Sequence, residues 1–249
     1  MFDEHFEVFL ADTVEGKKEH YKLRYQVYCE EMGYEEKNIF ADQQEKDFWD
    51  RKAVHFLIRH KETKQWVGAM RMVFKQGNKL PFQEFCSLPS SEDKNITEIE
   101  ISRLCLVKEI RKRKTDQEPP LGLNIKSDSK QQTPQNSESS ENIKDFYSRR
   151  NVSRSLIWGL FRAASIYSAK HHIDNWYFLG TKALARIISK EGFAMTQVGG
   201  ACNHRGQRFP FKVEMDEILN NSIWSSDFKN GYRLYSELDV EYLPDVISA

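Results

Sequence analysis

The segment ITEIEISRLCL, residues 96–106, has the composition of a β-strand, yet it carries ionisable side chains in its middle. Its apolar residues suit a buried strand; they are Ile99, Ile101, Leu104, Cys105 and Leu106. Glu100, Ser102 and Arg103 do not suit a strand that is covered on both faces. A charged group removed from water needs a partner or a chemical role. The segment is therefore either an edge strand with solvated charges or a central strand that carries a functional site.

Strand geometry limits how these three side chains can cooperate. A regular strand directs Glu100 and Ser102 to one face and Arg103 to the other, and a β-bulge would change that arrangement. If the strand is buried, loss of hydration raises the pKa of the Glu100 carboxyl toward neutrality. A carboxylate in that range can accept a proton as a general base.

The flanking sequence predicts the elements that surround this strand. They are a strand at 6–10, a helix from Asp12 or Thr13 to Met32, a hairpin at 53–60 and 65–74, a short helix near 80–85, a helix from Ser153, a strand at 176–179, a helix capped by Thr181 and ended by Gly192, and extended pieces around 203–211. Strands and helices that alternate in this way form a mixed α/β sheet flanked by helices. We therefore predict one domain, residues 1–249.

Residues 115–142 interrupt this pattern. The stretch holds five serines and three prolines, and its larger apolar residues are Leu121, Leu123 and Ile125. Such a composition cannot bury enough surface to offset the entropy of ordering the chain. We therefore predict a flexible insertion within the domain.

Two arginines upstream of the strand are further candidates for the site. Arg24 borders an aromatic stripe of the N-terminal helix. An arginine on a helix surface is normally solvated, so Arg24 alone is weak evidence for a site. Arg71 interrupts an apolar strand that should be buried on both faces. It either pairs with Asp47 or Asp50 inside the protein, or binds an anionic ligand through its planar guanidinium. The sequence leaves both alternatives open.

Composition and motifs exclude several classes of function. Lysine plus arginine and aspartate plus glutamate number 37 each, so no global charge favours nucleic acid or a membrane surface. The four cysteines lack a CxxC pair, which predicts reduced thiols, and the histidines lack metal-ligand spacing, so we expect no metal. No GxSxG, GxGxxG or GxxxxGK[ST] motif is present. No apolar run is long enough to span a bilayer, and we expect a cytoplasmic protein.

A basic run follows the strand at residues 108–114, KEIRKRK. Its cations are Lys108, Arg111, Lys112, Arg113 and Lys114, and Arg149 and Arg150 follow beyond the predicted insertion. An isolated run of this kind is either a solvated cluster or a docking surface for an acidic protein. The chain lacks the net charge and the motifs of a nucleic-acid binder.

Six segments in order resemble a known group of enzymes. They are RYQVYCEEMGY, DFWDRKAVHFLIRH, WVGAMRMVF, LPFQEF, EISRLCL and HRGQRFPF. They resemble acyltransferases associated with the PEP-CTERM/exosortase system, which are related to acyl-homoserine-lactone synthases and long-chain N-acyl amino acid synthases. The resemblance covers nearly all of the chain apart from the insertion. It implies a GNAT-like, autoinducer-synthase-like fold.

The resemblance also implies roles for individual residues. Glu100, Ser102 and Arg103 match the E-x-S-R signature, whose glutamate is proposed to help deprotonate an amine. The substrate-binding set implied by the resemblance comprises Arg24, Tyr28, Asp47, Asp50 and Arg71. Tyr28 and Tyr34 stand where the lactone synthases tend to have Phe and Trp, which weighs against S-adenosylmethionine as the amine.

The function implied by the resemblance is transfer of a long-chain acyl group from a thioester to the amine of an amino acid or similar molecule. The thioester, on acyl carrier protein or CoA, is a co-substrate, and no tightly bound cofactor is expected. Acyl carrier protein is acidic, so the basic residues at 108–114 with Arg149 and Arg150 are candidates for docking it. Two alternatives stay open. One is an acetyl-CoA-dependent N-acetyltransferase, although the pyrophosphate loop expected after Val107 is missing; the other is a non-catalytic module that binds a lipid or a protein partner.

Overall fold

A computed structural model describes residues 2–76, 79–86, 96–111, 149–190, 192–225 and 227–238. The predicted insertion at 115–142 lies outside these residues. The N-terminal half contains α1 (Phe2–His5), β1 (Phe6–Leu10), α2 (Val14–Tyr25), a π-helical turn (Gln26–Glu31), β2 (Ala53–His60), β3 (Trp66–Phe74) and β4 (Glu98–Leu106). It also has 3-10 turns at Lys37–Ile39, Phe48–Lys52 and Pro81–Glu84.

The second half completes the same sheet. It contains α4 (Arg149–Lys170), β5 (Asn175–Gly180), α5 (Lys182–Ser189), β6 (Thr196–Gln197), β7 (Cys202–Asn203), β8 (Gln207–Glu214), α6 (Met215–Leu219), a 3-10 turn (Ser222–Ser225) and β9 (Arg233–Leu234). The strand order is β6-β8-β5-β4-β3-β2-β1-β9, and β7 pairs with β8 off this path. The β4–β5 and β1–β9 pairs are parallel, and the other pairs are antiparallel.

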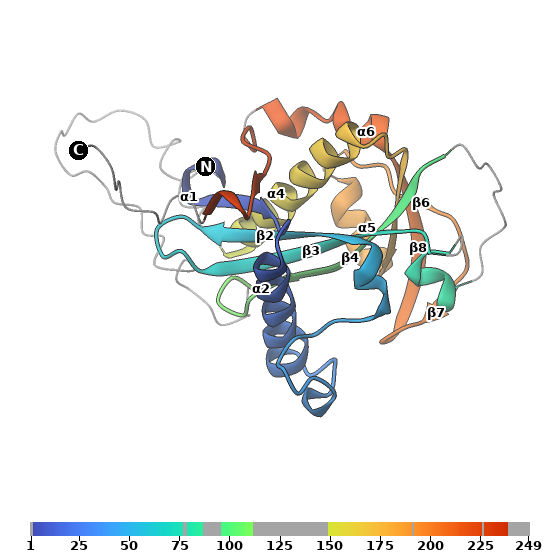
Figure 1. Cartoon of the computed structure of the whole chain (residues 1–249). Helices are drawn as coiled ribbons and strands as arrows, with labels where there is room; N and C mark the ends of the chain where they lie inside the picture. The colour runs from blue at the N-terminus through green and yellow to red at the C-terminus, as the bar shows by residue number, and fades with distance from the viewer. Residues whose placement is uncertain are drawn as a thin grey trace, which may run out of the picture.

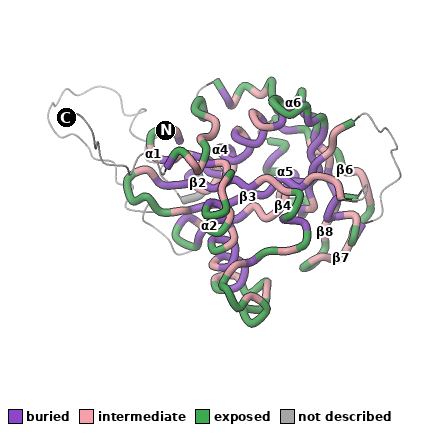
Figure 2. Tube along the Cα trace, viewed as in Figure 1, coloured by how far each residue is buried: buried purple, intermediate pink, exposed green. Residues whose placement is uncertain are grey.

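Helices cover both faces of the sheet. Figure 1 shows α4 and α6 on one side of the strands and α2 on the other. The buried residues follow the strands and the inner side of α4 (Figure 2). The predicted mixed α/β fold, with a central sheet between helices, is confirmed.

Local signals placed the starts of two helices correctly. The Thr13 hydroxyl accepts a hydrogen bond from the Gly16 N–H (3.0 Å), and the Thr181 hydroxyl accepts one from the Leu184 N–H (3.1 Å). Such caps satisfy backbone donors that lack a partner inside the helix. The predicted helix to Met32 differs in its last part, where the chain takes a wider π-helical turn closed by the Met32 N–H and the Val27 carbonyl (3.0 Å).

The position of β4 decides how its charges are interpreted. β4 lies between β3 and β5, so it is a central strand. Glu100 is only 4% exposed. The interpretation of this segment as an edge strand with solvated charges is therefore wrong.

Candidate active site

A cavity of about 920 Å³ opens where β4 and β5 separate. The two strands pair from Glu98 and Asn175 as far as Ile101 and Phe178. Beyond that point β4 continues to Leu106, whereas β5 pairs only with β8. The separation leaves room between the strands, and apolar side chains line it; they include Phe82, Leu106, Ile157, Phe178, Leu179 and Leu184.

Glu100 lies on the wall of this cavity. Its Oε2 accepts a hydrogen bond from the Phe82 backbone N–H (2.7 Å), which belongs to the 3-10 turn Pro81–Glu84. Burial raises the pKa of Glu100 to about 8, because the charged form loses its hydration; the Phe82 N–H, Arg71 and Arg103 oppose the rise only in part. The carboxyl can therefore both release and accept a proton near neutral pH.

A β-bulge brings Arg103 into the same cavity. Ala69 of β3 pairs with Cys105 and Arg71 pairs with Ser102, so two residues of β4 oppose one residue of β3. Arg103 takes a left-handed backbone conformation at the bulge (φ +52°). Arg103 and Arg71, which pairs with Ser102, therefore both reach Asp47, although a regular strand would turn Arg103 and Ser102 to opposite faces.

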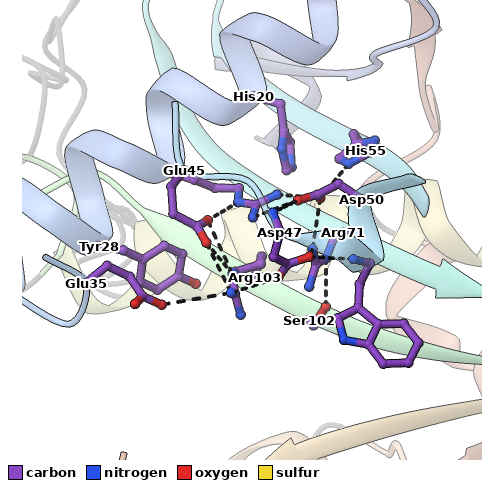
Figure 3. A network of polar contacts seen from close by, with 12 residues as sticks. His20, Tyr28, Glu35, Glu45, Asp47, Asp50, His55, Arg71, Ser102 and Arg103 are labelled. Carbon is purple, nitrogen blue, oxygen red and sulfur yellow. Dashed lines mark hydrogen bonds and ion pairs between the residues drawn. The ribbon is translucent and has the colours of Figure 1, made fainter. Parts of the chain in front are cut away.

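Carboxylates surround the Arg103 guanidinium (Figure 3). Its Nη2 donates to Glu45 Oε1 (3.1 Å) and to Asp47 Oδ2 (3.0 Å), and it lies 4.0 Å from Glu35 Oε1. Strain at a bulge persists only where the surroundings hold it. Glu45 and Asp47 supply that restraint.

Arg71 pairs inside the protein and also lines the cavity. Its Nη1 lies 2.6 Å from Asp47 Oδ1 and 2.9 Å from Asp50 Oδ1, and its Nε donates to the Ser102 hydroxyl (3.2 Å). Asp47 and Asp50 also cap the turn Phe48–Lys52. Asp47 Oδ1 accepts from the Trp49 N–H (2.9 Å), and Asp50 Oδ2 accepts from the Asp47 N–H (2.7 Å). One D-x-x-D pair thus both shapes its loop and orients Arg71.

Arg24 lies behind the cavity wall. Its side chain is fully buried, its Nε donates to Glu45, and its Nη1 and Nη2 donate to Asp50 at 2.7 and 3.2 Å. His55 Nε2 also contacts Asp50 (3.0 Å). Arg24 and Asp50 are absent from the cavity lining among the described residues. The structure therefore places them as supports for residues that reach the cavity.

Sequence inspection missed Glu45. This residue is 1% exposed and accepts hydrogen bonds from both Arg24 and Arg103. Burial alone would raise its pKa, but the two guanidinium groups lower it below the usual value. The available signal was its position two residues before Asp47, which places acidic residues at 45, 47 and 50.

Tyr28 closes another side of the cavity. Its hydroxyl donates to the Leu104 carbonyl (3.2 Å), and the Arg103 guanidinium carbon lies 5.8 Å from its ring centre. Tyr34 stacks beside it, with ring centres 6.4 Å apart, and remains 49% exposed. Burial raises the pKa of Tyr28, so its hydroxyl stays protonated at neutral pH.

The predicted docking residues are described only in part. Lys108 is exposed just after β4, and Arg111 contacts Glu31 and lines the cavity. Lys112, Arg113 and Lys114 lie outside the described residues. Arg149 and Arg150 begin α4, and their side chains are not described.

The β7–β8 hairpin adds residues that sequence inspection did not select. His204, Arg205 and Arg208 line the cavity, and the His204 ring packs on Phe85 at 4.1 Å between centres. Beside this contact Cys86 and Cys202 form a disulfide, while Cys29 and Cys105 are free. The expectation of four reduced thiols is therefore wrong for that pair, because the fold brings together residues 116 positions apart.

The described part of the chain lacks a metal-binding cluster and a membrane-spanning helix. It holds no cluster of three or more His, Cys, Asp or Glu side chains suited to a metal ion. None of its helices combines the length and apolar character that a bilayer span requires.

Comparison with known proteins identifies the architecture. The profile of the acetyltransferase (GNAT) domain family matches residues 23–118. The structure of BjaI, a CoA-dependent acyl-homoserine lactone synthase bound to MTA, superposes with a TM-score of 0.57 over 92% of both chains at 13% identity. The chain has the GNAT fold.

Two further GNAT-like structures are similar to it. FeeM, an N-acyl amino acid synthase from uncultured soil microbes, gives a TM-score of 0.50 over 88% of this chain and 95% of its own, at 10% identity. The acyl-homoserine lactone synthase LasI gives 0.50 over 85% and 90%, at 17% identity. No curated protein matches in sequence. At these low identities the similarity establishes only the fold: the GNAT architecture extends over most of the chain.

Proposed function

We propose that the protein is an N-acyltransferase that moves an acyl group from a thioester to an amine. The observation that carries this proposal is Glu100, a buried carboxyl with a pKa of about 8 on the wall of a mostly apolar cavity. Arg71 and Arg103 line the same cavity. A base, an apolar acyl site and fixed positive charge are what amide formation from a thioester requires.

The reaction begins with an amine that arrives protonated. The Glu100 carboxylate accepts a proton from the ammonium group, which frees the nitrogen lone pair. The nitrogen attacks the thioester carbonyl and forms the C–N bond. The C–S bond then breaks with its electron pair on sulfur, and the leaving thiolate takes up the second proton lost by nitrogen. The products are an amide and a free thiol.

The cavity supports a long acyl chain rather than an acetyl group. Its walls come from both sides of the β4–β5 separation and include Ile157 of α4 and Leu184 of α5. Each buried methylene contributes about 0.8 kcal/mol to binding.

The donor in this proposal is acyl carrier protein. The basic residues of 108–114 follow the strand that borders the cavity, and exposed Lys108 begins this run. An acidic carrier would be attracted to a sequence run with this charge. Acyl-CoA is the competing donor, favoured by the match to the acetyltransferase domain profile and by the CoA-dependent synthase BjaI.

A direct assay tests the proposal. Purified protein is incubated with acetyl or palmitoyl groups on CoA or on acyl carrier protein, together with a panel of amino acids, and products are detected by mass spectrometry. We expect palmitoyl amides, and a rate at least about 100-fold lower in Glu100→Gln. Glu217→Gln, at an exposed position of α6, is the matched control and should keep full activity.

Two results would count against this function. Full activity in Glu100→Gln would remove the assigned base. Co-purifying fatty acyl species without amide formation from any amine would favour a lipid-binding module instead. Mass spectra of lipids from cells that express the chain would identify the natural acyl and amine groups.

A further inference from the structure

The hydrogen bond to Glu100 comes from a turn that must be held against β4. The Phe82 N–H that donates this bond belongs to the 3-10 turn Pro81–Glu84. The turn is closed by its own side chains, because Gln83 Oε1 accepts a hydrogen bond from the Leu80 N–H (2.7 Å). Such a local bond fixes the shape of the turn but not its position relative to the strand.

The side chain of Tyr177 packs against this turn from the sheet. Tyr177 of β5 is the strand partner of Glu100 and is 6% exposed. Its ring stacks on the Phe82 ring, with the ring centres 5.4 Å apart and the planes inclined by 23°. Both rings belong to a small apolar cluster that is distinct from the main core and also contains Leu80 and Cys86. Tyr177 is therefore the residue of β5 on which Phe82 rests.

Two polar contacts hold Tyr177 at its other end. Its hydroxyl donates to Glu98 Oε1 (2.8 Å), and Glu98 Oε2 lies 2.5 Å from Lys75 Nζ. Glu98 shares a face of β4 with Glu100, because side chains alternate along a strand. A continuous chain of contacts thus runs from Lys75 of β3 to the Phe82 N–H at Glu100.

The disulfide between Cys86 and Cys202 restrains the turn in a different direction. Cys202 belongs to β7, whose partner strand is β8. The disulfide therefore ties the end of the turn to the β7–β8 hairpin, whereas the stacked rings tie the turn to β5 beside Glu100.

Resting on the proposed function, we propose that Tyr177 is a positioning residue whose ring holds the Phe82 N–H against the Glu100 carboxylate. A hydrogen bond to a carboxylate favours its charged form. Loss of the ring contact should let the turn move away, so that Glu100 ionises at a higher pH and less of the base is present at pH 7. The Tyr177 hydroxyl contacts Glu98 and supports the ring, so Tyr177→Phe should keep most of the effect.

Other charges act on Glu100, and the variants that test Tyr177 leave them in place. Arg71 and Arg103 lower the pKa of Glu100, and Asp47 raises it. The further titratable side chains of the cavity wall include Tyr28, Glu84, His204, Arg205 and Arg208. A change in the ionisation of Glu100 on loss of the Tyr177 ring is therefore not the loss of one of these groups.

Two measurements test this role. NMR titration of the Glu100 carboxyl in ¹³C-labelled protein, assigned with Glu100→Gln, requires no turnover, and the pH dependence of kcat/KM reports the same group in the working enzyme. In Tyr177→Leu we expect both to move upward by about one pH unit. The rate at pH 7 should fall about tenfold, while the limiting rate at high pH stays within about threefold. Tyr25→Leu, which removes a similarly buried tyrosine outside the cavity lining, is the control and should leave both unchanged.

Phe82→Leu removes the other ring and tests the same contact if Tyr177→Leu does not fold. The titration of Glu100 should move by the same amount as in Tyr177→Leu. The double variant should move it no further, because both substitutions act through one ring contact.

Different results separate this inference from the proposed function. An unchanged Glu100 titration in Tyr177→Leu and Phe82→Leu would overturn the inference, and so would an equal loss of rate at every pH. A shift as large in Tyr177→Phe as in Tyr177→Leu would also overturn it, because the hydroxyl and not the ring would then be responsible. A shifted titration in a protein that forms no amide from any thioester would leave the inference standing and overturn the proposed function.

Discussion

The backbone N–H of Phe82 donates a hydrogen bond to Glu100 Oε2 at a distance of 2.7 Å. This contact joins a 3-10 turn to the central strand and fixes the carboxyl at the cavity wall. A single backbone donor does not replace the hydration that the carboxylate loses. Glu100 therefore remains a carboxyl that ionises close to neutral pH.

Acyl transfer should accelerate as pH rises through about 8. The reactive form of Glu100 is the carboxylate, and its pKa of about 8 leaves most of it protonated at pH 7. We expect kcat/KM for the acceptor to rise about tenfold per pH unit below this pKa and then to level off. Steady-state rates from pH 6 to 9.5 measure this. The control is Glu100→Gln, in which only the acceptor's own amine titrates; identical profiles for the two proteins would contradict the prediction.

Glu100→Gln should stabilise the protein at neutral pH. The folded pKa of about 8 exceeds the ordinary value of 4.5, so the unfolded chain loses its proton first as pH rises. The free energy of unfolding of the wild type therefore falls as pH rises from 4.5 to 8. The glutamine side chain of the variant does not ionise, so the variant avoids that fall. We expect a gain of about 1 to 3 kcal/mol at pH 7, measured by urea unfolding, and little gain at pH 4. Equal stability of the variant and the wild type at both pH values would contradict burial of this carboxyl.

Arg24→Met should destabilise the fold strongly. It leaves Glu45 and Asp50 buried without one of their cationic partners. Removal of one partner from a buried ion pair costs about 3–5 kcal/mol. Chemical unfolding measures the change. Lys22→Met, which breaks an exposed pair with Glu19 on the same helix, should cost less than about 1 kcal/mol. Similar losses for the two variants would show that the Arg24 network is not buried as described.

Leu184→Trp should shorten the acyl chain that the enzyme accepts. Leu184 projects from α5 into the cavity, and a larger ring would exclude methylenes of a long chain. Loss of two buried methylenes lowers the ratio of long- to short-chain turnover by about tenfold. Competition between palmitoyl and octanoyl donors measures this ratio. Ile187→Trp, on the same helix but 52% exposed, is the control; an unchanged ratio in Leu184→Trp would place the acyl chain elsewhere.

Local sequence signals predicted much of the fold. The hairpin strands at 53–60 and 66–74 and the caps at Thr13 and Thr181 follow from residue pattern and side-chain hydrogen bonding with near neighbours. The ionisable residues of β4 marked this strand as a candidate for a functional site, and the sequence left the edge-strand alternative open. The structure brings Glu100, Ser102 and Arg103 to the cavity wall, while their catalytic roles remain predictions.

The remaining features depend on contacts between distant segments. The bulge at Arg103 is defined by its register against β3 and is held by Glu45, 58 positions away. Arg208 reaches the cavity only because β8 pairs with β5, and Cys86 meets Cys202 only because the β7–β8 hairpin returns to the turn at Pro81–Glu84. Such pairings are set by the tertiary fold, which no local pattern encodes.

Single-turnover kinetics with a preloaded acyl donor show whether Glu100 removes the proton from the amine. Wild type and Glu100→Gln are mixed with saturating acceptor at pH 8, and amide is quantified by rapid quench and mass spectrometry. We expect the variant to bind donor and acceptor normally but to form amide at least about 100-fold more slowly. Amide formation at the wild-type rate in Glu100→Gln would contradict this role.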